Sequence, residues 1–144
     1  MKHVLLVLVA FLLIPACGGD SSSPNYSGNY TRTVNDAYDY CSNGMSGYVY
    51  GGTVNNQVKH EGDSLRIYKL GVASPDTLLF EGSITSDGAF TVESKPYYND
   101  YGRGVSKMSG AFSNNGWYGD YNYTFENYDG FTCWWDTKFS GSKM

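Results

Sequence analysis

The chain has 144 residues, and its 14 acidic and 10 basic side chains give a formal net charge of −4. This length fits a single domain, and an acidic chain without a basic patch argues against a nucleic-acid partner. Aromatic residues make up 17% of the chain, with 14 tyrosines, and there are 18 glycines. Helix formers are scarce after residue 17, so the composition predicts an all-β fold with many tight turns.

An apolar segment opens the chain. Lys2 precedes an unbroken apolar run over residues 4–14. A membrane span needs about 20 residues, so this run is too short for one, but it has the length of a signal-peptide core. The run ends in the sequence IPAC over residues 14–17, followed by a stretch rich in Gly and Ser. An aliphatic residue, two small residues and a cysteine in this order resemble the lipobox of bacterial lipoproteins.

The resemblance implies that Cys17 carries a diacylglycerol on its thiol. In that family, signal peptidase II cuts directly before the lipidated cysteine, which then begins the mature chain. The chain is therefore expected to divide into a signal peptide over residues 1–16, a flexible tether over 17–27 and a β domain over 28–144. The resemblance implies that the protein contacts the membrane through this N-terminal lipid.

The residue after the cysteine bears on localisation. In Gram-negative lipoproteins, an Asp at that place retains the protein at the inner membrane, whereas here Gly18 follows Cys17. The resemblance therefore implies a lipid-anchored protein of the cell envelope, at the outer membrane if the organism has one. The alternative is an ordinary secretory signal that is cut after Ala16.

Apolar residues alternate along the rest of the chain with the period of two that half-buried strands require. Leu78, Phe80 and Ile84, for example, share one face of a predicted strand. Eight strands are predicted, over residues 28–34, 54–61, 64–70, 77–85, 89–96, 104–113, 117–127 and 131–140. Short connections between them favour an antiparallel meander.

The registers of four hairpins follow from matching apolar faces across each turn. Three-residue loops are predicted at 86–88 and 128–130, and two-residue turns at 62–63 and 115–116. The predicted partners are Ile84 with Phe90, Phe125 with Cys133, His60 with Leu65, and Phe112 with Gly119.

The predicted fold is a single up-and-down meander of about eight antiparallel strands closed into a barrel, because closure removes exposed sheet edges. The outline resembles the lipocalin-like small β-barrels of envelope lipoproteins, and a β-sandwich is the alternative. Residues 35–53 form either a long crossing loop or an extra strand. Large inward side chains predict a packed interior, among them Trp117, Tyr121, Tyr123, Phe125 and Trp135.

Two cysteines remain after Cys17. An exported protein meets an oxidising compartment, so Cys41 and Cys133 are predicted to form a disulfide. The bridge closes a loop of about 90 residues, adds about 4–5 kcal/mol in chain-entropy terms, and pins residues 35–53 to the last strand. Two free thiols are the alternative. No metal site is predicted, because two cysteines and one mature-chain histidine are too few ligands for a closed zinc site.

No residue pattern predicts catalysis. His60 has no nucleophile or carboxylate near it in sequence and is interpreted as a partly buried or rim histidine. The carboxylates fall in turns or on outward faces and form no pair of the kind that a glycosidase needs. The sequence contains no calcium-loop, nucleophile-elbow or phosphate-loop motif. We therefore expect neither enzyme activity nor a cofactor.

Tyrosines in predicted loops are the strongest indication of binding, because aromatic rings contact sugars and form protein hot spots. Tyr97, Tyr98 and Tyr101 stand together in a loop predicted before Gly102 and are candidate binding residues. The alternative is that Tyr is simply favoured in strands.

These observations favour a monomeric, non-catalytic module that binds a partner or has a structural role. The partner would be a protein, a glycan or a small apolar ligand that a lipocalin-like barrel carries. Inhibition of a secreted enzyme is a weaker alternative, because no inhibitor motif occurs in the sequence.

Overall fold

The computed structural model describes residues 24–71 and 74–144. The predicted signal peptide, the predicted lipidation site at Cys17 and most of the predicted tether lie outside the described residues. The described residues form strands and one short 3-10 turn, η1 (Pro75–Thr77), without an α-helix. The strands are β1 (Gly28–Val34), β2 (Ala37–Cys41), β3 (Ser46–Val49), β4 (Gly52–Glu61), β5 (Ser64–Lys69), β6 (Leu78–Ile84), β7 (Ala89–Ser94), β8 (Tyr97–Asn99), β9 (Gly102–Ser113), β10 (Gly116–Asn127) and β11 (Thr132–Ser142).

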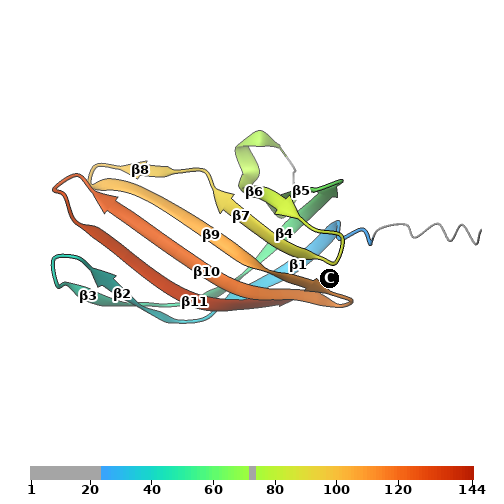
Figure 1. Ribbon diagram of the computed structural model, residues 1–144, viewed down its shortest axis with the longest axis horizontal. Helices are drawn as coiled ribbons and strands as arrows, with labels where there is room; N and C mark the ends of the chain where they lie inside the picture. Colours follow the sequence, from blue (N-terminus) through green and yellow to red (C-terminus); the bar gives the residue numbers. More distant parts are fainter. Residues whose placement is uncertain (1–23, 72–73) are drawn as a thin grey trace, which may run out of the picture.

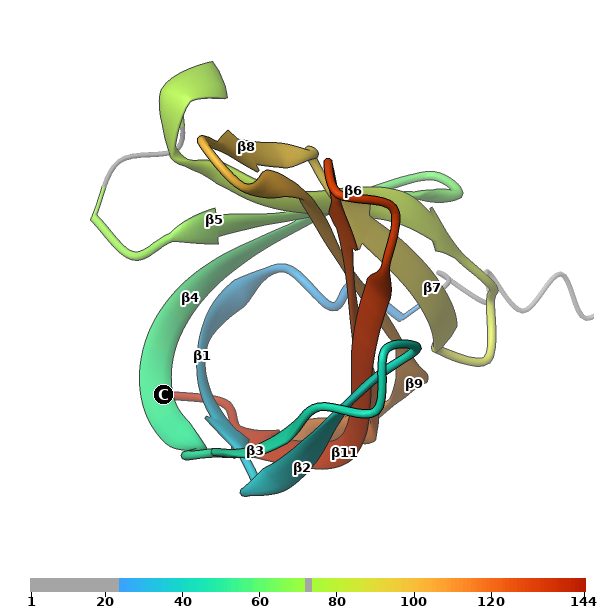
Figure 2. The same ribbon diagram turned by 90° about the vertical axis from the view of Figure 1, so that its left-hand side faces the viewer.

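The sheet closes on itself. β1 pairs with β4 along its whole length and with β11 at Thr33 and Val34. Between these two partners the strands follow in the order β4-β5-β6-β7-β9-β10-β11, each antiparallel to the next, and Figure 2 shows the ring that results. The predicted closed barrel of eight antiparallel strands is confirmed. The β-sandwich alternative is wrong, because β1 joins the two ends of the sheet.

Three of the four predicted hairpin registers are confirmed. These are the hairpins that turn at residues 62–63, 86–88 and 128–130. The observed partners are His60 with Leu65, Ile84 with Phe90, and Phe125 with Cys133.

The fourth hairpin register is wrong by one residue in the position of the turn. β9 and β10 are joined at residues 114–115 rather than 115–116, so Phe112 lies opposite Trp117. Gly116 belongs to the strand, where a side chain would collide with the backbone of β11. Inward and outward faces are unaffected, because the shift moves each partner by two residues.

Three strands lie outside the closed ring. β2 and β3 form a hairpin, and β2 pairs with β11 through Cys41 opposite Cys133 and Tyr40 opposite Trp134. Residues 35–53 thus contain an extra strand pair rather than a crossing loop. β8 pairs with β9, so the predicted loop before Gly102 is in fact a short strand and a tight turn.

Aromatic side chains fill one end of the barrel. Trp117 is 1% exposed and donates a hydrogen bond from Nε1 to the Thr31 carbonyl oxygen at 2.7 Å. Tyr26, which lies within the predicted tether, stacks on Phe112 with ring centroids 4.9 Å apart. The buried cluster around them consists of Tyr30, Val58, Leu65, Ile67, Phe80, Ile84, Phe90, Val92, Met108, Phe112, Trp117 and Phe139.

The opposite end is built differently. β9, β10 and β11 run on beyond the ring and are flanked there by β8 and by the β2–β3 hairpin (Figure 1). The predicted packed interior is found at Trp117, whereas Tyr121, Tyr123, Phe125 and Trp135 are only partly buried. The barrel is therefore packed at one end and less densely filled at the other.

Candidate functional site

A cavity of about 250 Å³ lies at the less densely filled end of the barrel, and we call it the mouth cavity. Strands β1, β4, β10 and β11 supply its walls, and the segment between β3 and β4 forms its rim. The side chains that define it are Arg32, Val34, Tyr50, Val54, Tyr121 and Trp135.

Val54 shows that this end of the interior is incompletely filled. It lies opposite Arg32 across β1 and β4, on the same face of β4 as Asn56 and Val58, which are 0% and 1% exposed. By strand alternation, Val54 therefore faces the interior, yet it is 45% exposed. An apolar side chain that faces inward but remains in contact with solvent is available to a ligand.

One wall of the mouth cavity is a fixed aromatic surface. The rings of Tyr121 and Trp135 stack with centroids 5.2 Å apart and an interplanar angle of 16°. The Tyr121 hydroxyl also donates a hydrogen bond to Ser106 Oγ at 3.0 Å. The packing and the hydrogen bond together hold the Tyr121 ring in one orientation.

Arg32 is the charged residue of the mouth cavity. Its side chain is only 8% exposed, and its guanidinium lies 5.1 Å from the ring centroid of Phe80 and 5.6 Å from that of Tyr121. Nη1 donates to Met108 Sδ at 3.1 Å. Nε has no hydrogen-bond partner among the described residues. Burial lowers the pKa of Arg32 from its ordinary value, and the neighbouring Tyr121 opposes the shift.

Arg32 also lacks a neutralising carboxylate. The ion pairs of the described part of the chain involve other cations, namely Arg66 with Glu61, Arg103 with Glu126, Lys107 with Glu93, and Lys138 with Asp120. All of these pairs lie at exposed positions. Five cations of residues 24–71 and 74–144 take part in no ion pair, and among these Arg32 is the buried one.

Sequence reasoning missed Arg32. The signal was present, because the alternation that places Tyr30 and Val34 inside the barrel also places Arg32 there. An arginine on the apolar face of a predicted strand is therefore a signal for a binding residue.

The rim of the mouth cavity is held by Asp36. Its carboxylate accepts hydrogen bonds from the Tyr48 hydroxyl and from the Gly51 N–H, the latter at 2.7 Å. The Tyr48 bond, and then the Gly51 bond, lower the pKa of Asp36 below its ordinary value. The same bond raises the pKa of Tyr48. Asp36 thus fixes the segment that carries Tyr50.

The three tyrosines that the sequence singled out are exposed, but they do not form one surface. Tyr97, Tyr98 and Tyr101 are 60%, 62% and 71% exposed. Burial raises the pKa of the inward-facing Tyr123, and the neighbouring Tyr97 adds to this shift. Tyr98, in contrast, contacts Arg103, which lies on the outer face of the barrel. Neighbouring residues of a strand point to opposite faces, so a single ligand would contact only part of the set.

The predicted Cys41–Cys133 pair is present as a disulfide, with its sulfur atoms 2.03 Å apart. The carboxylate of Asp39 lies beside them, and these three residues are the one cluster of potential metal ligands in the described part of the chain. Disulfide sulfurs are not thiolates and do not bind zinc as cysteine ligands do. The cluster therefore offers a single carboxylate and makes no metal centre.

His60 has a structural role. Its Nδ1 accepts a hydrogen bond from the backbone N–H of Tyr26, at 3.3 Å, so Nε2 carries the proton and donates to the Gly62 carbonyl oxygen, at 2.7 Å. Both ring nitrogens are thereby used by backbone groups. The interpretation of His60 as a partly buried rim residue agrees with this geometry.

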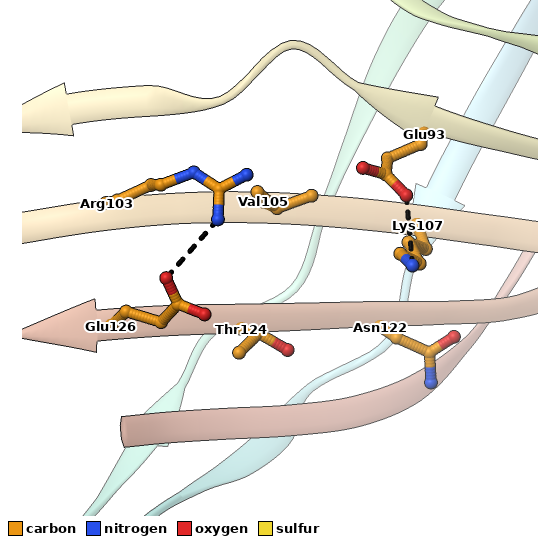
Figure 3. Close-up of a pocket in the computed structure, with 7 residues that line it drawn as sticks. All are labelled: Glu93, Arg103, Val105, Lys107, Asn122, Thr124 and Glu126. Carbon is orange, nitrogen blue, oxygen red and sulfur yellow. Dashed lines mark hydrogen bonds and ion pairs between the residues drawn. The ribbon is translucent and has the colours of Figure 1, made fainter. Parts of the chain in front are cut away.

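A second hollow, of about 270 Å³, lies on the outer face of β9 and β10. Figure 3 shows its charges arranged in two ion pairs, Arg103 with Glu126 at 3.3 Å and Lys107 with Glu93 at 3.0 Å. Exposed, mutually neutralised side chains of this kind leave no charge for a ligand. We therefore take the mouth cavity, and not this hollow, as the candidate site.

No protein-family model, no curated protein and no solved structure matches this chain. Among the described residues, no helix has both the length and the apolar character that crossing a membrane would take.

Proposed function

We propose that the chain is a lipid-anchored protein of the bacterial cell envelope that binds a small, largely apolar ligand in the mouth cavity and has no catalytic activity. The observation that carries the proposal is the exposed inward face of Val54 beside the stacked rings of Tyr121 and Trp135. Ligand sites are typically concave and mostly apolar with a few placed polar groups.

The closed fold supports a carrier role. A barrel of eight strands holds side chains or one small ligand, and here the aromatic cluster around Trp117 fills one end while the mouth stays accessible. At about 250 Å³, the cavity is slightly below the usual range of roughly 300–1,000 Å³ for ligand pockets. The ligand is accordingly small.

The proposed localisation at the cell envelope rests on the sequence around Cys17 and its resemblance to a lipobox. It is tested by metabolic labelling with palmitate in the native organism, with Cys17→Ser as the comparison. Labelling of the unmodified chain and none of the variant supports the anchor. Equal labelling of both would exclude Cys17 as the lipid site.

Ligand binding is tested by native mass spectrometry of the protein purified from its own envelope. We expect a co-purified small molecule that is absent from Val54→Trp, because an indole at position 54 occupies the mouth. Val105→Trp is the matched control, since Val105 lies on the outer face of β9 (Figure 3). Equal ligand content in all three proteins, or none in any of them, would contradict the proposal.

A second candidate function is contact with a glycan through the exposed tyrosines of the β2–β3 hairpin and of the adjoining rim of the mouth cavity. Tyr38, Tyr48 and Tyr50 are 61%, 46% and 82% exposed, and their rings pack edge to face in sequence. Amide shift changes in β2 and β3 on adding envelope oligosaccharides, lost in Tyr38→Ser and Tyr50→Ser, would favour it. Shift changes confined to the mouth would reject it.

A further inference from the structure

Arg32 is a cation enclosed by apolar groups. The packing partners of its guanidinium are two aromatic rings and the thioether of Met108. Ring faces and thioethers are weak partners for a charge, and a buried ion without a full set of partners is unfavourable. The fold nevertheless keeps this charge in place at the inner end of the mouth cavity.

The mouth cavity gives this cation access to a ligand. Arg32 lines it, and none of its other lining side chains in the described chain is acidic. The nearest acid along the rim, Asp36, already accepts hydrogen bonds from Tyr48 and Gly51. The cavity therefore combines apolar walls with one uncompensated positive charge at its base.

We propose that Arg32 binds the carboxylate of a small amphiphilic ligand whose apolar part lies against Val34, Val54 and Trp135. The inference rests on the proposed function and adds the chemical class of the ligand. The planar guanidinium presents parallel N–H donors that match the two oxygens of a carboxylate.

The size of the cavity limits the apolar part. Its volume of about 250 Å³ corresponds to that of about eight water molecules at roughly 30 Å³ each. A carboxylate with a chain of about eight carbons, or with one aromatic ring, fills such a space. A long-chain acid would extend out past Tyr50 into solvent.

A ligand-binding Arg32 and a purely structural Arg32 predict opposite changes in the stability of the ligand-free protein when the residue is replaced. If Arg32 served to hold Phe80 and Tyr121 through cation–π contacts, its replacement would destabilise the fold. If it is retained for a ligand, Arg32→Met should raise the urea midpoint of the ligand-free protein, because an apolar side chain of similar volume removes an uncompensated buried charge. A lower midpoint for Arg32→Met would overturn the inference.

Binding is measured by calorimetry on the full chain carrying Cys17→Ser, which removes the proposed lipid site. The probes are octanoate, octan-1-ol and octylamine, which share one tail and differ in charge. We expect octanoate to bind most tightly and octylamine least. Arg32→Met should weaken octanoate binding about 10- to 100-fold, as for loss of a charge-assisted hydrogen bond, and leave octan-1-ol within about twofold.

Two further variants sharpen the result. Arg32→Lys keeps the positive charge but loses the parallel N–H donors of the planar guanidinium, and it should give an intermediate octanoate affinity. Arg66→Met removes an exposed arginine that pairs with Glu61 and should leave all affinities unchanged. Equal binding of octanoate and octan-1-ol, unaltered by Arg32→Met, would overturn the inference and leave the proposed function standing. No binding of any probe would overturn both.

Discussion

Gly110 of β9 lies directly opposite Gly119 of β10, at the point where the two backbones approach too closely for a side chain. A Cβ on Gly110 would lie 2.0 Å from the Tyr118 carbonyl oxygen, and one on Gly119 would lie 2.0 Å from the Ser109 carbonyl oxygen. Both distances are far inside van der Waals contact. The two glycines therefore permit the strong local coiling that brings these long strands around the barrel.

Gly110→Ala should accordingly destabilise the domain, because the backbone must shift to make room for the added methyl group. Overpacking of this kind costs about 1–3 kcal/mol. The measurement is the urea unfolding midpoint. Gly47→Ala is the matched control, because Gly47 also lies in a strand but has nothing within 4 Å of an added Cβ. Comparable midpoints for the two variants would show that the close approach at Gly110 is unimportant.

A similar close approach, at Gly116, explains the one hairpin that the sequence predicted incorrectly. An Asn-Gly pair is a strong turn signal, so Asn115-Gly116 was the natural place for the turn. Gly116 is instead required inside β10, where a Cβ would lie 2.1 Å from the Gly141 carbonyl oxygen. Local turn chemistry cannot reveal a contact with a strand 25 residues further along the chain, and only the closed barrel supplies it.

The disulfide between Cys41 and Cys133 should contribute substantially to stability. It closes a loop with a sequence separation of 92 residues, which corresponds to about 4–5 kcal/mol in the chain-entropy account. The Cys41→Ser, Cys133→Ser double variant should therefore melt well below the oxidised protein. Thermal unfolding followed by circular dichroism measures the difference.

Dithiothreitol provides the control for this experiment. It should lower the melting temperature of the unmodified protein towards that of the double variant and leave the double variant unchanged. If reductant and substitution both leave the melting temperature where it was, the bridge fastens the β2–β3 hairpin without stabilising the barrel.

Trp117 should be the most sensitive position of the aromatic end. Trp117→Ala removes a buried indole from contact with Phe112, Phe139 and their neighbours and should cost about 3–5 kcal/mol. Trp117→Phe keeps an aromatic ring but loses the hydrogen bond to the Thr31 carbonyl, and should cost about 1–3 kcal/mol. Chemical denaturation measures both.

Tyr118 is the matched control, since it neighbours Trp117 in β10 but is 59% exposed on the outer face. Tyr118→Ala should change stability by no more than about 0.5 kcal/mol. A loss for Tyr118→Ala as large as that for Trp117→Ala would mean that the outer face of β10 is covered by something other than solvent.

The eight strands of the closed ring, their order and the cysteine pair could be predicted from hydrophobic alternation, hairpin registers and the oxidising compartment, whereas β2, β3 and β8 were missed. The site could not be read in the same way. Tyr97 and Tyr98 were predicted to bind together because tyrosine rings suit many ligands, yet as neighbours in β8 their side chains point to opposite faces. Arg32 could not be singled out, because its burial without an acidic partner depends on which strands surround it after the barrel closes.

The rim of the mouth cavity should respond to acid through Asp36. Its pKa is lowered in the folded protein by the hydrogen bonds from Tyr48 and Gly51, whereas the unfolded chain has the ordinary value of about 3.9. A depressed pKa means that the carboxylate favours the folded rim above about pH 4, and that this contribution is lost as the pH falls through the lower folded value. Amide exchange at Gly51 should therefore accelerate in that acid range, relative to exchange at other amides.

Carboxyl-carbon NMR titration of Asp36 tests the cause of the shift. Tyr48→Phe deletes the hydrogen-bond donor that lowers the pKa of Asp36 most and should move the titration midpoint of Asp36 upward, towards the ordinary value. Tyr50→Phe is the control, because the Tyr50 ring packs on Tyr48 while the bonds to Asp36 come from Tyr48 and Gly51. An unchanged midpoint in Tyr48→Phe would assign the shift to the Gly51 N–H alone, and the rim would then be held by the backbone without the tyrosine.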